Sequence, residues 1–243
     1  MPGGMDELAR RLAGSFRVIE PAQRRSGGAP LTVAGHVEDM HALIEAEGPA
    51  TGRPALVGHS WGAMLALAIA AAHPALVGPI ALIGCGTFSA AARATLRREV
   101  DRRMDGDLRR RLRHLDEAVA DVDARFAAMG LMLAPVYSHE LTALPRIGRC
   151  DRRGHEETWA DMLRLQATGV YPAAFGAITA PILMLHGKDD PHPGAMIRDD
   201  LRRVMPQSEY VEFERCGHYP WLERAAKEEF LDALCRWLEA HAS

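Results

Sequence analysis

Short apolar runs alternate with helical patterns through most of this 243-residue chain, and this alternation most restricts its fold. The runs that predict strands are residues 16–19, 55–58, 79–83, 182–186 and 209–214. Helical spacing covers residues 6–12, 32–47, 61–73 and 225–240. Such alternation is typical of a mainly parallel sheet with helices on its faces. The sequence therefore predicts an α/β fold.

A long helical block interrupts this alternation. Residues 88–175 show helical patterns and no clear strand. An insertion of that length is commonly a lid or cap over a site. We therefore predict a core formed by residues 1–87 and 176–243, with residues 88–175 as a helical cap.

The strongest local signal is the segment 58–62, which fits G-x-S-x-G between an apolar run and an Ala-rich helical run. Small residues at Gly58 and Gly62 would let neighbouring backbone approach closely. Ser60 would then project at the carboxyl end of a strand, where the helix start favours developing negative charge. The backbone N–H of Trp61 is the candidate oxyanion donor. The alternative is a chance pentapeptide at a strand–helix corner.

Two later segments hold a candidate acid and a candidate base. Asp189 and Asp190 closely follow a predicted strand, where a carboxylate can hold an imidazole in one tautomer. His218 lies in a Gly/Pro loop before the final helix. Alone, such residues are often a turn aspartate and a solvated histidine. The order Ser, Asp, His, each after a predicted strand, instead predicts that they meet at one edge of the sheet.

Together these segments resemble the α/β-hydrolase family, and within it the proline-iminopeptidase-like branch. The matching stretches are residues 58–62, 185–193 and 217–223. The resemblance implies an α/β-hydrolase fold and a serine hydrolase with Ser60 as nucleophile, Asp190 as acid and His218 as base. It also favours Asp190 over Asp189, because the family's acid usually follows the strand glycine by three residues. No metal or organic cofactor is expected.

The chain departs from that family at its start. Family members carry an H-G-G-P-G-like loop that supplies a second oxyanion donor, and this chain begins where that loop should just have ended. Residues 20–27 look like an eroded copy of the family's D-Q-R-G-S-G segment, with Ala22 and Arg25 at the Asp and first Gly positions. We therefore expect a chain truncated at its N-terminus relative to the family. Gly3 and Gly4 are the candidates for a substitute N–H.

The missing segment includes a strand that lies inside the family's sheet rather than at its edge. Residues 16–19 would then have to pair directly with residues 55–58, or backbone groups would stay unpaired. Losing one oxyanion donor costs about 10²–10³ in turnover. The chain is thus expected to be a fragment, a weakened enzyme, or a protein completed by a partner strand, for example in a homodimer.

The predicted cap leaves several roles open. Nine arginines lie between Arg93 and Arg113, interleaved with acids; they indicate an anion-binding surface or, as we expect, a solvated helix face with i, i+4 pairs. Glu156 and Glu157 could hold the free amine of a peptide, or be plain helix surface. Apolar residues that line a pocket or pack on the core are Phe126, Met129, Leu131, Met132, Leu133, Val136 and Tyr137. Candidates for substrate contact are His59, Trp159 and Tyr219.

Composition excludes other classes of function. A net charge of −3 does not suggest nucleic acid or an anionic membrane as a partner. Four scattered cysteines without a CxxC pair predict reduced core thiols rather than a disulfide framework or a metal site. No signal peptide is recognisable, and the longest apolar run, residues 63–72, is too short to span a bilayer. A cytoplasmic location is expected.

Three hypotheses follow. The first is a serine esterase acting on small or medium acyl esters, which the absence of a W-x-x-W-E type segment in the cap favours. The second is an aminopeptidase of the iminopeptidase type. The third is a non-catalytic α/β-hydrolase-like protein that lacks its oxyanion loop.

Overall fold

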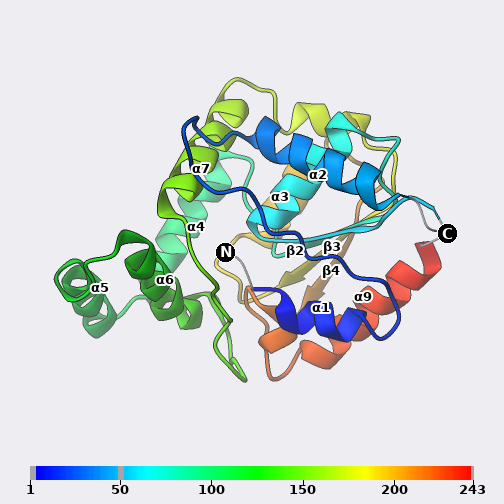
Figure 1. Ribbon diagram of the computed structural model, residues 1–243. Helices are drawn as coiled ribbons and strands as arrows, with labels where there is room; N and C mark the ends of the chain where they lie inside the picture. Colours follow the sequence, from blue (N-terminus) through cyan, green and yellow to red (C-terminus); the bar gives the residue numbers. More distant parts are fainter. Residues whose placement is uncertain (1–3, 49–51, 242–243) are drawn as a thin grey trace.

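The computed structural model describes residues 4–48 and 52–241, and its centre is a parallel β-sheet (Figure 1). Its strands, in spatial order, are β1 (Leu56–His59), β2 (Ile80–Ile83), β3 (Ile182–Gly187) and β4 (Glu209–Phe213). The register aligns Leu56 with Ile80 and Ile80 with Ile182. Because every neighbouring pair is parallel, the carboxyl ends of all four strands lie at one edge. The predicted α/β fold is confirmed.

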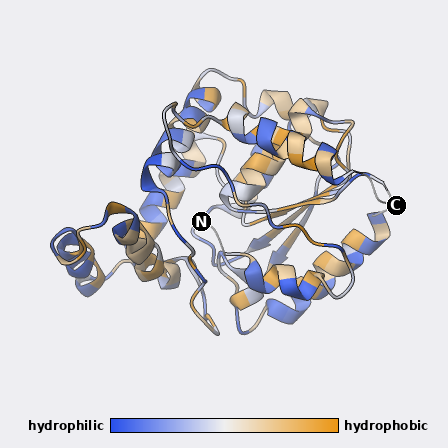
Figure 2. Cartoon of the chain, viewed as in Figure 1, coloured by the Kyte–Doolittle hydropathy of each residue, from blue (hydrophilic) through white to orange (hydrophobic). Residues whose placement is uncertain are grey.

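Helices cover both faces of this sheet (Figure 1). One face carries α2 (Val33–Glu47), α3 (Trp61–Ala72) and α8 (Gly194–Arg202), and the other carries α1 (Asp6–Leu12) and α9 (Lys227–His241). Sequence reasoning had missed α8. The apolar helix α3 stands out in Figure 2. Thr32 caps α2, since its side chain accepts the N–H of Gly35.

The two hydrophobic cores meet at the central strands. Along β2, Ile80 and Leu82 pack into the core beneath α3, whereas Ala81 and Ile83 pack into the core beneath α9. This follows from the two-residue period of a strand. Because β2 and β3 are buried on both faces, their sequences are continuous apolar runs. Burial of each of their aliphatic side chains stabilises the folded state by about 1.5–3 kcal/mol relative to an exposed side chain.

The region between β2 and β3 is helical, as expected. It holds α4 (Ala90–Arg103), α5 (Gly106–Ala118), α6 (Val122–Leu133), η1 (Ala134–Tyr137), α7 (Arg152–Ala167) and η2 (Ala173–Ala177). Four of these helices begin at a side-chain cap, supplied by Ser89, Asp105, Asp121 and Asp151. In Figure 1, α5 and α6 extend away from the sheet. The division into core and cap stays a prediction.

The strand predicted at residues 16–19 is wrong. This segment has no regular structure, and in the described part of the chain no strand pairs with the outer side of β1. The physical reason lies in its side chains. Phe16 and Val18 pack on the core beneath α9, and Arg17 forms an ion pair with Glu47 at the end of α2, so the segment is held by side chains rather than by a ladder.

No helix in the described ranges combines the length and the apolar character needed to cross a bilayer.

Candidate active site

Ser60 occupies a strained turn between β1 and α3. Its φ of 54° and ψ of −114° lie in a region that non-glycine residues rarely adopt, at a cost of about 1–3 kcal/mol. The Ser60 N–H donates to Ile83 O at 2.9 Å, and the Ser60 carbonyl accepts the N–H of Ala63 at 3.1 Å. The elbow is therefore fastened both to the neighbouring strand and to the helix that follows.

The two glycines of the elbow play different parts. A Cβ at Gly58 would lie 2.3 Å from the Gly62 carbonyl oxygen, which no side chain could tolerate. A Cβ at Gly62 would meet no atom within 4 Å. The close backbone approach that we expected at both glycines thus occurs at Gly58 and not at Gly62.

The predicted oxyanion donor lies at the start of α3. Trp61 is the first residue of that helix, so its N–H has no partner one turn earlier within the helix. Of the substitute donors suggested by the sequence, Gly4 lines the same cavity as Ser60, and Gly3 lies outside the described residues.

The structure brings Asp190 and His218 together at the carboxyl edge of the sheet. Asp190 follows β3, His218 follows β4, and His218 Nδ1 is 2.6 Å from Asp190 Oδ2. Both residues are buried, at 6 % and 4 % exposure. The N–H of His218 also donates to Tyr137 O at 2.7 Å. Since Nδ1 is engaged by the carboxylate, Nε2 is the ring nitrogen left for a substrate or a nucleophile.

A second imidazole holds the same carboxylate, and sequence reasoning missed it. His192 reaches Asp190 Oδ1 through both its backbone N–H and its Nδ1, each at 2.8 Å, and its ring stacks on His218 with centroids 4.5 Å apart. The ligand atoms of the three residues lie within 4.8 Å of one another, a set that could hold a metal ion. Their mutual hydrogen bonds suit an acid–base pair better. The sequence Asp-Pro-His was the available signal for this contact, because it lets the His192 ring fold back onto the Asp190 carboxylate.

A buried carboxylate fixes the His218 loop. Glu223 is fully buried, and its oxygens accept the N–H groups of Gly217, His139 and Glu140 at 2.8, 2.9 and 2.7 Å. It therefore ties the loop that carries His218 to the segment after η1. Its position within the stretch 217–223 was visible in the sequence, but its partners 80 residues earlier were not.

The charges favour an ionised acid and a neutral base. Burial raises the pKa of Asp190, but the charges and hydrogen bonds of His218 and His192 outweigh it and hold that pKa well below its usual range. Burial lowers the pKa of His218, and the opposing effect of Asp190 does not restore it. At neutral pH His218 is therefore free to accept a proton.

Asp189, the competing acid, points elsewhere. Its carboxylate pairs with His139 Nδ1 at 2.9 Å and is 41 % exposed, and its carbonyl accepts Arg103 Nη1 at 2.6 Å. The turn after β3 thus points the side chain of Asp189 outward and that of Asp190 inward, and this decides between the two adjacent aspartates.

His59 joins the elbow to the loop of the base. Its Nε2 donates to the His218 carbonyl oxygen at 2.8 Å, and the two rings are 4.5 Å apart. Close by, a Cβ at Gly84, which has φ +50°, would lie 2.9 Å from His218 Nδ1. Within the described chain Ser60 Oγ makes no hydrogen bond; catalytic contacts of this kind commonly tighten only when substrate binds.

Ser60 and His218 line one cavity of about 1770 Å³. The predicted contact residues His59, Trp159 and Tyr219 and the predicted oxyanion donor Trp61 are on its wall. The helical-block residues on the wall are Phe126, Met129, Leu133 and Tyr137. The lining of described residues does not include Leu131, Met132 or Val136.

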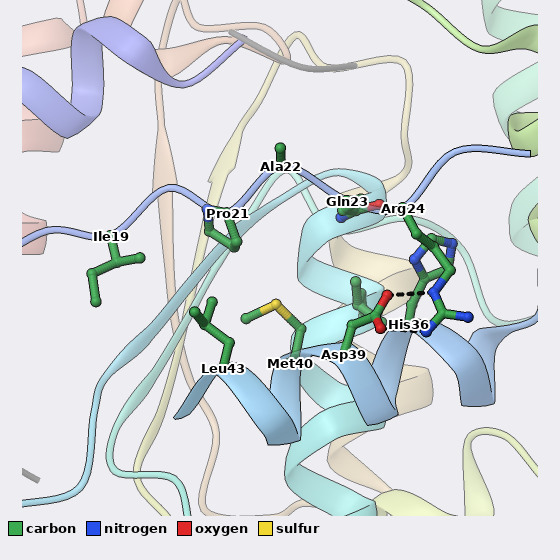
Figure 3. A pocket seen from close by; sticks show the side chains of 10 residues that line it. Ile19, Pro21, Ala22, Gln23, Arg24, His36, Asp39, Met40 and Leu43 are labelled. Carbon is green, nitrogen blue, oxygen red and sulfur yellow. Dashed lines mark hydrogen bonds and ion pairs between the residues drawn. The ribbon is translucent and has the colours of Figure 1, made fainter. Parts of the chain in front are cut away.

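A second cavity of about 390 Å³ lies between α2 and the extended segment that follows α1 (Figure 3). Its charged residues neutralise each other, since the Arg24 guanidinium binds Asp39. His36 on its wall is buried and bonded to Thr158 Oγ1 at 3.2 Å. None of Ser60, Asp190 and His218 lines it.

Comparisons with known proteins agree with this architecture. A model described as "Alpha/beta hydrolase family" matches residues 2–233. A 2-hydroxy-6-oxononadienedioate/2-hydroxy-6-oxononatrienedioate hydrolase 1 of Dechloromonas aromatica (strain RCB) is 28 % identical over 176 residues, covering 71 % of this chain. The chain spans 58 % of the length of that relative.

Solved structures show the same fold. An E-2-(acetamidomethylene)succinate hydrolase superposes with a TM-score of 0.61 at 20 % identity, over 98 % of this chain and 87 % of that one. A thermophilic esterase from Thermogutta terrifontis, solved with malate bound, superposes with a TM-score of 0.60 at 22 % identity, over 98 % of this chain and 84 % of that one. Because the family model spans residues 2–233, the chain belongs to the α/β-hydrolase family.

Proposed function

We propose that this protein is a serine hydrolase that cleaves carboxylic esters through an acyl-enzyme. The observation that carries the proposal is the buried pair of His218 and Asp190, 2.6 Å apart, on the wall of the cavity that also receives the strained Ser60. An ionised acid bonded to Nδ1 fixes the tautomer in which Nε2 is basic.

In the proposed reaction Ser60 Oγ attacks the ester carbonyl carbon while its proton passes to His218 Nε2. The charge that develops on the carbonyl oxygen is stabilised by the Trp61 N–H at the start of α3. His218 returns the proton to the departing alkoxide, so an alcohol leaves and an acyl-Ser60 ester remains. Water, deprotonated by His218, then attacks that ester, and His218 returns the proton to Ser60 Oγ as the acid is released.

An ester substrate is supported over a peptide with a free N-terminus. Glu156 pairs with Arg152 at 2.8 Å and Glu157 with Arg153 at 2.7 Å, each one helical turn along α7. Glu157 also accepts the N–H of Leu31 at 2.9 Å. Neither acid belongs to the described cavity lining, so neither is placed to hold a substrate amine. The Dechloromonas relative, named as a hydrolase of an oxo dioate, also supports a small-molecule substrate.

A non-catalytic protein is the remaining alternative, because a single oxyanion donor would lower turnover by about 10²–10³. The maintained strain at Ser60 and the inward-turned Asp190 support a working site instead, since strained backbone persists only where surrounding structure enforces it.

A fluorophosphonate probe and a series of 4-nitrophenyl esters test the proposal. We expect the probe to label Ser60 in the folded protein, and Ser60→Ala to remove both labelling and ester hydrolysis. Ser89→Ala is the matched control, because that serine caps α4 and lies outside the described cavity lining. A folded protein that is neither labelled nor active would contradict the proposal and favour the non-catalytic alternative.

A further inference from the structure

Helix α4 lies across the carboxyl edge of the sheet. At its start Arg93 binds Gln166, whose Nε2 donates to the Thr87 carbonyl in the loop after β2 at 3.1 Å. At its end Arg103 donates to the carbonyl of Asp189 after β3, at 2.6 Å. The helix is thus fixed at both ends near the loops that follow two adjacent strands, β2 and β3.

Two arginines of α4 face that site. Arg93 and Arg97, four residues apart and therefore on one face of the helix, both line the cavity that contains Ser60 and His218. Leu96 lines it beside them. Arg93 is half-buried, so its guanidinium cannot be treated as a freely solvated surface charge.

The acids that could neutralise these arginines are engaged elsewhere. On the same helix, Glu99 binds Arg102 and Arg103, and Asp101 binds Arg109. Arg93 has the neutral amide of Gln166 as its partner, and among the described residues Arg97 takes part in no ion pair. Burial, and after it the charge of Arg97, lowers the pKa of Arg93.

Three of the six other arginines in the described cavity wall have acidic partners and a structural role. Arg24 is held by Asp39, Arg25 by Asp123, and Arg17 by Glu47. Like charges at i and i+4 destabilise a helix by about 0.2–0.5 kcal/mol, and the partial burial of Arg93 adds to that cost, whereas Arg97 is exposed. Two unneutralised guanidinium groups on one wall of a reaction cavity are instead suited to bind an anion.

We propose that Arg93 and Arg97 form a carboxylate-binding subsite, and that the substrates are esters that carry a free carboxylate. This inference rests on the proposed function, since it names the substrate class of that same site. A carboxylate can accept two N–H groups from one planar guanidinium, which also orients the ester relative to Ser60. The sequence-based expectation of a solvated arginine face therefore does not describe Arg93, which is half-buried, whereas Arg97 is exposed and lines the cavity.

A matched pair of esters tests the subsite. Mono-4-nitrophenyl adipate and 4-nitrophenyl hexanoate differ in whether the acyl chain ends in a carboxylate or in a methyl group. We expect the wild-type protein to have the higher kcat/KM for the adipate ester. Arg97→Gln should lower the ratio of the two kcat/KM values about tenfold or more, chiefly through KM for the adipate ester.

The control lies on the same helix. Arg98 is exposed, as Arg97 is, but it contacts Thr95 Oγ1 and is absent from the described cavity lining, so Arg98→Gln should keep the wild-type ratio. Arg97→Gln removes no described protein contact and should fold, whereas Arg93→Gln also breaks the contact with Gln166. Equal ratios for Arg97→Gln and Arg98→Gln, or no preference in the wild-type protein, would overturn the subsite.

Binding separates failure of the subsite from failure of the esterase. Calorimetry with adipate, a non-reacting dicarboxylate, should show binding to the wild-type protein and weaker binding to Arg97→Gln even if no ester is hydrolysed. Absence of adipate binding together with hydrolysis of the hexanoate ester would overturn this inference and leave the proposed esterase standing.

Discussion

The two halves of the candidate site are held in very different ways. Asp190 and His218 lie after the strands β3 and β4, are buried, and are surrounded by hydrogen bonds from His192 and from the loop that Glu223 fixes. Ser60 lies after β1, whose outer side has no partner strand in the described chain. Its position depends on one strained turn and on the contact between His59 and the His218 loop.

This difference separates two ways of positioning catalytic groups. The acid–base half is held by redundant bonds, so removing any one of them should have a graded effect. The nucleophile half is held by backbone conformation at an open edge, so it should respond to steric changes in the turn. Substitutions in each half, each with a neighbouring control, test the comparison.

The largest effect is expected in the acid–base half from Asp190→Asn. An amide can donate to Nδ1 and so favour the tautomer with a protonated Nε2, which should lower kcat by about 10³–10⁴. Asp189→Asn is the control, because that carboxylate binds His139 at the surface. Steady-state hydrolysis of a 4-nitrophenyl ester measures both. If Asp189→Asn proved the more damaging change, the assignment of the acid would be wrong.

An intermediate effect is expected in the nucleophile half from Gly58→Ala. Its Cβ would lie 2.3 Å from the Gly62 carbonyl oxygen, so the turn must shift, at a cost of about 1–3 kcal/mol in the free energy of unfolding. Probe labelling of Ser60 should slow in parallel. Gly62→Ala has room for its methyl group and should keep the wild-type stability. Chemical denaturation compares the two, and equal losses would show that the elbow is not sterically defined.

The smallest effect is expected from His192→Leu, which removes one of several donors to Asp190. We expect kcat to fall about tenfold, and His192→Asn, which keeps a side-chain donor, to recover part of it. The pH profile adds a second readout. Burial holds the pKa of His218 below its usual value, so the acid limb of kcat/KM should lie below about pH 6.5.

The sign of the shift in His192→Leu follows from charge. The electrostatic effect of His192 lowers the pKa of His218, so its removal should raise that pKa and move the acid limb to higher pH. An unshifted profile with a lower kcat would mean that His192 acts by shape rather than by charge.

Stability should also fall on acidification. The pKa values of Asp190 and His218 are depressed in the folded protein, so the unfolded chain binds more protons as the pH falls. Their contribution to the free energy of unfolding is therefore fully present above the ordinary histidine pKa of about 6.5 and is lost progressively below it.

Much of the fold could be predicted because it is encoded locally. The central strands are short runs of aliphatic residues buried on both faces, and the elbow pentapeptide marks the junction of β1 and α3. The strand prediction at residues 16–19 failed because a short apolar run indicates side chains that can be buried and does not identify a hydrogen-bonding partner. Helix α8 was missed because it follows directly on the motif that contains Asp190.

The sequence by itself determined the four strands of the sheet, the elbow at Ser60 and the candidates Asp190 and His218, since each is a pattern of neighbouring residues. Tertiary structure decided which aspartate turns inward, that His192 shares its carboxylate, and that Arg93 and Arg97 line the cavity with no ion pair to any residue that the structure describes. These outcomes depend on contacts between segments far apart in the chain. Burial and charge compensation arise only when those segments pack together, so local spacing cannot report them.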